Sequence, residues 1–211
     1  MGIPVLILGE SGSGKSTSLR NFEKGEVGIF NVESKPLPFR KKLSVLNTDS
    51  YQVIERCLTN PQNTELKTYV IDDSQYLLAE ELFRTVKEVG YSKYTNMAVN
   101  FKNLISTIIK KTPPDTIVYL LHHVETDANG KLKAKTIGKM LDTQLTVEGL
   151  FAIVLLCVTD GVSHKFITQS DGTTTAKSPM GMFEREIDND LKMVDKTIRD
   201  YYFGKDDEEN G

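Results

Sequence analysis

The sequence predicts an α/β protein in which a mainly parallel sheet is flanked by helices. Five short, almost entirely apolar segments recur along the chain, and stretches with helical periodicity separate most of them. Such segments are typical of parallel strands that are covered on both faces. Turn signals late in the chain, at Asn129-Gly130 and Asp171-Gly172, predict β-hairpins, which we expect to extend the sheet at one edge.

The expected elements follow from apolar runs, capping residues and chain breakers. Asp49 or Ser50 can cap the second helix, and Pro113-Pro114 ends the fourth. We expect strands at 4–8, 27–32, 68–71, 116–121 and 151–158. Helices are expected at 15–24, 50–58, 75–89, 96–111, 139–147 and 186–202. The first hairpin is expected at 125–136, and the second from 165–169 to 175–177.

The composition is that of an ordinary globular protein. The chain has 211 residues, a net charge of −3 and 39% hydrophobic residues, which favours one domain, expected at 1–203, followed by a disordered acidic tail at 204–211. No apolar run approaches the roughly 20 residues of a membrane span, and no signal-peptide pattern begins the sequence. Cys57 and Cys157 are isolated in apolar surroundings, so we expect reduced thiols and a cytoplasmic location.

The most specific motif is Gly9-Glu10-Ser11-Gly12-Ser13-Gly14-Lys15-Ser16. It follows an expected strand and precedes an expected helix, which is the context that a phosphate-binding P-loop requires. Glycines allow backbone N–H groups to converge on phosphate oxygens, and the helix N-terminus adds a favourable dipole. We expect Lys15 to reach the β- and γ-phosphates, Ser16 to ligate Mg²⁺ and Thr17 to approach the α-phosphate of a nucleotide.

Asp72 is the expected partner of Ser16 at the metal. It follows the third apolar run, so its carboxylate should lie at the carboxyl edge of the sheet, where open α/β sheets bind ligands. Carboxylate and hydroxyl oxygens are ligands that suit Mg²⁺. The sequence therefore predicts a site for Mg²⁺ together with ATP.

Two acids compete for the activation of an attacking water. Glu33 follows the second apolar run, and Asp73 directly follows Asp72. Either carboxylate could orient and polarise water beside a γ-phosphate. We favour Glu33 and keep Asp73 as the alternative.

Two histidines end the fourth apolar run. His122 or His123 could lie between the two acidic strand ends and hydrogen-bond the γ-phosphate, which would make one of them a sensor of ATP against ADP. The sequence does not choose between the two. Neither residue belongs to a Cys/His/Asp cluster with the spacing of zinc ligands.

Lys177, near the end of the second expected hairpin, is the best candidate for a positive finger. Such a group stabilises charge on a transferring phosphoryl group and is often supplied by a neighbouring subunit. Arg185 is the second choice. Surface lysines and arginines are abundant, so for each residue we favour an ordinary surface cation over this role.

Two basic segments could contact a nucleic acid backbone. They are Arg40-Lys41-Lys42 and the first hairpin, where Lys131, Lys133, Lys135 and Lys139 stand close together. Alternating lysines on an exposed arm could follow a line of phosphates. Lysines that protect the edge of a solvated hairpin would give the same pattern.

Taken together, these motifs resemble the RecA-superfamily ATPases, in particular small phage-type nucleotide-binding proteins with a bare RecA-like core. The resemblance is carried, in this order along the chain, by the P-loop, Asn31-Val32-Glu33, the strand that ends in Asp72-Asp73, Leu120-Leu121-His122-His123 and the segment that leads to Ala176-Lys177. It spans residues 3 to about 200.

The resemblance implies an ATP hydrolase that forms rings or filaments with ATP at the subunit interfaces. Some members of the group anneal single-stranded DNA in phage recombination and replication. In that group the acid after the second strand activates water, the polar residue after the fourth senses phosphate, and mobile loops beginning here near Val124 face DNA. Single-stranded DNA and a homo-oligomer are therefore expected partners.

Two other functions stay open. A small-molecule or nucleotide kinase could use the same phosphate loop, although the sequence shows no arginine-rich lid. A regulatory nucleotide-binding module with little turnover is the third reading. The sequence contains no Asn-Lys-x-Asp pattern for guanine, so we expect ATP rather than GTP.

Overall fold

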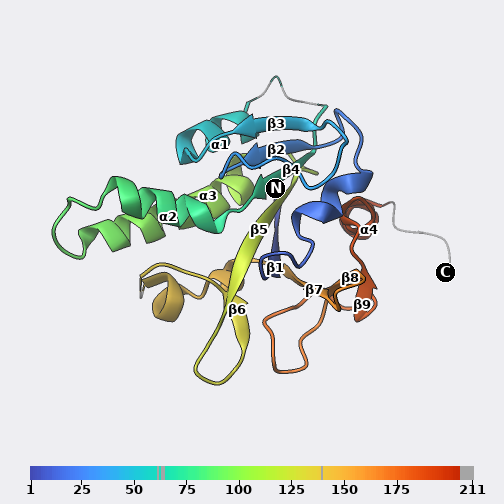
Figure 1. Ribbon diagram of the computed structural model, residues 1–211. Coiled ribbons are helices and arrows are strands. Elements are labelled where there is room, and N and C mark those ends of the chain that lie inside the picture. The colour runs from blue at the N-terminus through green and yellow to red at the C-terminus, as the bar shows by residue number, and fades with distance from the viewer. Residues whose placement is uncertain (61, 63–64, 139, 205–211) are drawn as a thin grey trace, which may run out of the picture.

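The computed structural model describes residues 1–60, 62, 65–138 and 140–204, with the backbone alone at 142–144. In this part of the chain nine strands form one sheet, and helices flank it (Figure 1). The strands are β1 (Ile3–Gly9), β2 (Gly28–Asn31), β3 (Ser44–Asn47), β4 (Thr68–Asp72), β5 (Ile117–Thr126), β6 (Leu132–Ala134), β7 (Ile153–Thr159), β8 (His164–Ile167) and β9 (Glu186–Asp188). The helices are α1 (Tyr51–Leu58), α2 (Gln75–Arg84), α3 (Ser92–Lys111) and α4 (Leu191–Phe203), with shorter 3₁₀ turns at Ser16–Asn21 and Val147–Leu150 and a π-helical turn at Met140–Leu145.

The sheet is mostly parallel. Its strand order is β3-β2-β4-β5-β1-β7-β8-β9, and the strands from β3 to β7 run parallel to one another. Strand β8 pairs antiparallel with β7, and β9 antiparallel with β8, so late antiparallel strands extend the sheet at one edge. The far end of β5 forms a separate antiparallel hairpin with β6. The α/β class and the mainly parallel sheet are confirmed.

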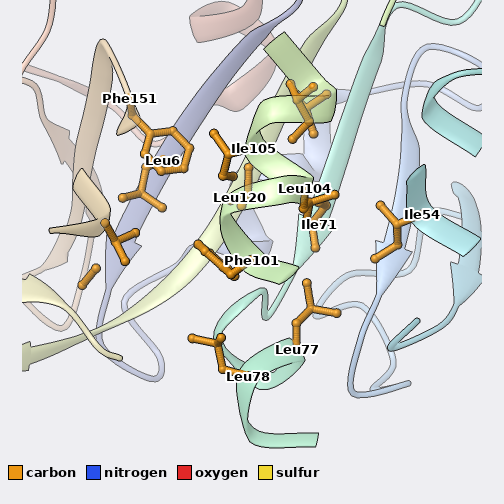
Figure 2. Packing of buried hydrophobic residues seen from close by; sticks show 14 of the residues in the cluster. Leu6, Ile54, Ile71, Leu77, Leu78, Phe101, Leu104, Ile105, Leu120 and Phe151 are labelled. Carbon is orange, nitrogen blue, oxygen red and sulfur yellow. The ribbon is translucent and has the colours of Figure 1, made fainter. Parts of the chain in front are cut away.

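Alternation along the strands divides the core between the two faces of the sheet. Val5 and Ile7 of β1 face α4 and the 3₁₀ turn after β1, while Leu6 and Leu8 face α1, α2 and α3. On the face to which Leu6 and Leu8 point, Figure 2 shows Phe101, Leu104 and Ile105 of α3 packed over the strands. Burial on both faces explains why these strands read as continuous apolar runs.

Most of the expected helices form with small shifts at their ends. Of the two expected caps, Asp49 and Ser50, it is Ser50 that caps α1, and its side chain accepts a hydrogen bond from the Val53 N–H. The helix expected at 15–24 is shorter, because only Ser16–Asn21 is helical and it is a 3₁₀ turn. The helix expected at 139–147 is a π-helical turn at Met140–Leu145, and residue 139 lies outside the described residues.

One strand was missed, and two further expectations are wrong in detail. Strand β3 was not expected, because its four residues are all exposed and show no apolar alternation. Segment 165–169 does not pair with 175–177; instead Lys177 forms an isolated bridge with Val154, and β8 lies between β7 and β9. The last helix begins at Leu191, because Glu186–Asp188 pairs as β9 and Asp190 then caps α4.

The expected tail at 204–211 is almost entirely outside the described residues. Gly204 is described and follows the end of α4, and its N–H donates to the carbonyl of Asp200. No helix in the described ranges is long and apolar enough to cross a membrane.

Candidate functional site

The glycine-rich loop joins the carboxyl end of β1 to the 3₁₀ turn that begins at Ser16. Gly12 and Gly14 have φ angles of 79° and 102°, in the left-handed region that favours glycine. Within the described residues, the N–H groups of Gly12, Gly14 and Lys15 donate to no protein acceptor. The N–H of Ser13, which lies between the two glycines, donates to the Glu10 carbonyl at 3.2 Å, so Gly14 and Lys15 are the consecutive residues whose unpaired N–H groups can form a concave anion-binding nest.

The side chain of Lys15 crosses the mouth of this loop. It is buried, and its Nζ donates to the carbonyl oxygens of Gly9 and Glu10, each at 2.8 Å. Burial lowers the pKa of the ammonium, while the carboxylate of Asp73 opposes that shift. The positive charge of Lys15 is thus fixed at the edge of the loop.

The expected metal ligands meet. Ser16 Oγ donates to Asp72 Oδ1 at 2.8 Å, and Asp72 is the last residue of β4. Burial raises the pKa of Asp72 to about 6, although the hydrogen bond from Ser16 opposes the shift. The pair places a hydroxyl and a carboxylate together next to the phosphate loop.

The loop and the strand ends enclose a cleft of about 430 Å³. Its lining comprises Ser11, Gly12, Gly14, Lys15, Ser16, Thr17, Asn31, Lys35, Pro36, Pro38, Asp72, Asp73, Gln75, Tyr76, His123 and Lys135. The described residues contain no group of three or more His, Cys, Asp or Glu side chains that could hold a metal by themselves. Mg²⁺ usually takes only one or two protein ligands and completes its shell with phosphate and water, so Ser16 and Asp72 suit it.

Asp73 projects into this cleft. Its φ angle is 60°, which is uncommon for a residue with a side chain. Its Oδ1 accepts from His123 Nε2 at 3.2 Å, and its Oδ2 accepts from Lys35 Nζ at 3.1 Å. Burial alone would raise the pKa of Asp73, but these hydrogen bonds outweigh it and lower the pKa. Asp73 is therefore an ionised carboxylate in the cleft.

Glu33, the favoured water-activating residue, is not part of the cleft lining. Its carboxylate lies beyond the end of β2, and Oε2 is 3.8 Å from Lys35 Nζ. Of the two acids, only Asp73 lines the cleft together with the phosphate loop.

The two histidines have different environments. His123 lines the cleft and stands edge-on to Tyr76, with 5.7 Å between the ring centroids. His122 is fully buried on the other side of the strand and does not line the cleft. Of the two sensor candidates, only His123 lines the cleft.

The hydrogen bonds of His122 fix its protonation. Burial lowers the pKa of His122 to about 4, so the ring is neutral near pH 7. The carbonyl of Lys135 can only accept, so Nε2–H donates to it at 2.8 Å. Nδ1 is then an acceptor for the Ser74 hydroxyl at 2.9 Å, and it shares that one proton with the Leu121 carbonyl, which lies 3.1 Å from the same oxygen. His122 thereby ties the middle of β5 to the start of α2 and to the residue that follows β6.

Neither candidate finger lines the cleft of its own chain. Lys177 exchanges both backbone hydrogen bonds with Val154 of β7, and Arg185 pairs with Asp171 at 3.5 Å. Because Lys177 does not line the cleft of its own chain, it could act as a finger only in the cleft of a neighbouring subunit.

Sequence reasoning missed Lys35. It lines the cleft and contacts both Asp73 and Glu33. A lysine three residues after the expected end of the second strand was the available signal, but surface lysines at such places are common. Sequence reasoning also did not place Lys135 at the cleft, which its backbone reaches by pairing its N–H with the His123 carbonyl.

Two side chains from β7 and β8 support the loop from behind, the expected core thiol of Cys157 and a histidine, His164, that was not expected there. Cys157 Sγ and His164 Nδ1 both contact the Ser13 carbonyl, at 3.0 and 2.8 Å. Cys57 and Cys157 are both free, as expected. A Cβ on Gly14 would meet the His164 ring at 2.7 Å, so this glycine is required by close packing as well as by its φ angle.

The basic segments are partly neutralised. Lys41 pairs with Glu23 at 2.8 Å, and Lys133 with Glu125 at 3.3 Å. Residue 139 lies outside the described part of the chain.

No model of a known protein family matches the sequence, and a search among characterised proteins finds no significant similarity.

Proposed function

We propose that this chain is a Mg²⁺-dependent ATPase of the RecA-like type. The observation that carries the proposal is the meeting, in one cleft, of the phosphate loop with its free N–H groups, the buried Lys15 and the Ser16–Asp72 pair. These groups supply positive potential for phosphates and hard oxygen ligands for a divalent cation. The loop, Lys15 and Ser16 follow β1, and Asp72 ends β4.

Each group has a role in binding. The N–H groups of Gly12 and Gly14 would hold phosphate oxygens, and Lys15 would neutralise their charge. Ser16 and Asp72 would hold Mg²⁺, which supplies charge neutralisation on the phosphate oxygens when it is bound. Since the Asp72 carboxylate is buried and its pKa is raised to about 6, a cation beside it would relieve the cost of its burial.

The reaction is an in-line displacement. A water oxygen forms a bond to the γ-phosphorus, the bond from that phosphorus to the β–γ bridging oxygen breaks, and ADP and inorganic phosphate result. A carboxylate orients the water and accepts its proton. The cleft lining favours Asp73 for this step over Glu33, which we had favoured from the sequence. His123, hydrogen-bonded to Asp73, would orient that carboxylate.

The composition of the lining favours hydrolysis over phosphoryl transfer to a second substrate. The described residues that line the cleft include three lysines, Lys15, Lys35 and Lys135, and no arginine. Kinases of this scaffold clamp the reacting groups with arginines from a lid. The absence of such groups from the described lining is why the kinase remains the second hypothesis.

The role in DNA metabolism rests on the resemblance described above. We extend the proposal to a homo-oligomer that acts on single-stranded DNA in phage recombination or replication. Light scattering after gel filtration, with and without ATP and an oligonucleotide, tests both parts. A chain that stays monomeric in every condition would rule out the finger role of Lys177 and the ring or filament.

Release of inorganic phosphate from ATP tests the activity itself. The wild-type protein should release phosphate in the presence of Mg²⁺, and single-stranded DNA should stimulate the release. Lys15→Ala should lower the rate by about a hundredfold or more, since it removes a group that stabilises transition-state charge. Lys102→Ala, on the exposed face of α3, is the matched control. Transfer of phosphate to a nucleoside monophosphate without net hydrolysis would instead favour the kinase.

A further inference from the structure

The backbone of Lys35 is fixed at the rim of the cleft. Asn31, a buried residue at the end of β2, donates from Nδ2 to the Lys35 carbonyl at 2.6 Å. Ser34, just before Lys35, turns the chain with a φ angle of 55°. Pro36 follows and restricts Lys35 to extended conformations. The main chain at this point is therefore well anchored.

The side chain of Lys35, in contrast, is free to change partners. It is 57% exposed, and its Nζ lies 3.1 Å from Asp73 Oδ2 and 3.8 Å from Glu33 Oε2. The same ammonium is 4.9 Å from the centroid of the Tyr76 ring. Ion pairs with this degree of exposure are weak, and lysine carries its charge on a flexible four-carbon stem. A stronger anion in the cleft can thus compete for this ammonium.

The cleft also brings Lys35 and Lys15 together. Both line it, and the charge of Lys35 contributes to lowering the pKa of Lys15, after the larger effect of burial. Lys135 lines the same space. Three cations around one cleft repel each other, and within the lining only the carboxylates of Asp72 and Asp73 oppose them, while Glu33 lies outside the lining at 3.8 Å from Lys35 Nζ. An anion with more than one negative charge would relieve this repulsion.

We infer that Lys35 binds the terminal phosphate of a nucleoside triphosphate, exchanging its contact with Asp73 for that phosphate. The inference rests on the proposed function and adds to it a residue that distinguishes ATP from ADP. When Lys35 leaves Asp73, one oxygen of this carboxylate loses its partner and becomes available to a water, while His123 retains the other. Lys35 thereby links recognition of the triphosphate to readiness for hydrolysis.

Calorimetric titration with ADP and with the non-hydrolysable β,γ-imido analogue of ATP, each with Mg²⁺, tests the inference. Lys35→Met should weaken binding of the triphosphate analogue by about tenfold, because one charge-assisted contact is lost, and change ADP binding by less than about twofold. Lys35→Gln should behave in the same way, and Lys35→Arg should retain part of the preference. Lys41→Met is the control, because Lys41 lies in the same loop, pairs with Glu23 and does not line the cleft.

The outcomes separate this inference from the proposed function. If the Lys35 variants weaken ADP and the triphosphate analogue equally, or weaken neither, the inference is wrong and nucleotide binding stands. If the wild-type protein binds neither nucleotide, both are wrong. Thermal unfolding of each variant verifies that it folds. The exposed side chain of Lys35 makes folding of at least the glutamine and arginine variants the expected result.

Discussion

Ser16 and Asp72 lie 56 residues apart in the sequence and are joined by a hydrogen bond of 2.8 Å from the serine hydroxyl to the carboxylate. The strand order explains the contact. Strands β1 and β4 are both neighbours of β5 and run parallel to it, so their carboxyl ends reach the same edge of the sheet. In the proposed function, a divalent cation held by this pair would bridge protein and phosphate.

Loss of either partner should alter the response to Mg²⁺. In Asp72→Asn and Ser16→Ala, the Mg²⁺ concentration that half-saturates ATP binding should rise by roughly tenfold or more, because one oxygen ligand is lost or weakened. Fluorescence titration of a labelled ATP analogue at several Mg²⁺ concentrations measures this. An unchanged Mg²⁺ dependence in both variants would exclude the pair as the metal site.

The two acids beside the cleft should differ in their effect on hydrolysis. Asp73→Asn should lower the rate of ATP hydrolysis by about a hundredfold or more, because it removes the carboxylate that lines the cleft. Glu33→Gln should change the rate by less than about threefold. Single-turnover phosphate release with both variants decides which acid activates water. A larger loss of rate in Glu33→Gln than in Asp73→Asn would assign that role to Glu33.

Gly14→Ala should disrupt the phosphate loop. A methyl group there would lie 2.7 Å from the His164 ring, at a φ angle of 102°. We expect nucleotide binding to weaken by tenfold or more, while the free energy of unfolding falls by about 1–3 kcal/mol. Gly12→Ala is the informative comparison, because a Cβ at Gly12 meets nothing within 4 Å and is disfavoured by its φ angle alone. Equal effects in the two variants would contradict the packing argument.

His122 should make the free energy of unfolding depend on pH. Burial lowers its pKa in the folded protein to about 4, against 6.5 in the unfolded chain. As the pH falls below 6.5 the unfolded chain takes up the proton first, so folding weakens until about pH 4, where the folded protein also binds it. The loss over this window should be roughly 3 kcal/mol.

Urea denaturation of the wild-type protein and His122→Gln at several pH values isolates this contribution. Glutamine does not titrate and can still donate to the Lys135 carbonyl, so the difference between the two proteins cancels the other groups. The wild-type stability should fall relative to the variant between pH 6.5 and 4. A constant difference across that range would show that the ring is not held neutral.

The sequence predicted the parts of the fold that are specified locally. Continuous apolar runs identified β1, β2, β4, β5 and β7, because strands buried on both faces need apolar residues at every position. The exposed edge strand β3 and the three-residue β9 have no such pattern, and only their hydrogen bonds to neighbouring strands define them. The hairpin signal at Asn129-Gly130 was correct because its turn joins two adjacent pairing segments.

The site was predicted in outline for a similar reason. The phosphate loop and Asp72 lie directly at strand ends, so a correct list of strands places them together. Lys35 could not be found in this way, because it lies in an irregular loop whose path depends on Asn31 and Pro36. The choice between His122 and His123 also required the structure, since adjacent residues on a strand face opposite sides of the sheet.

Calorimetric titration of ATP with Mg²⁺ into the wild-type protein and Lys15→Met tests the central claim most directly. We predict saturable binding at one site per chain in the wild type, and binding weakened by at least about tenfold in the variant, since the ammonium at the loop mouth is lost. Absence of saturable binding in the wild type, or equal binding in both proteins, would contradict the assignment of this loop as a nucleotide site.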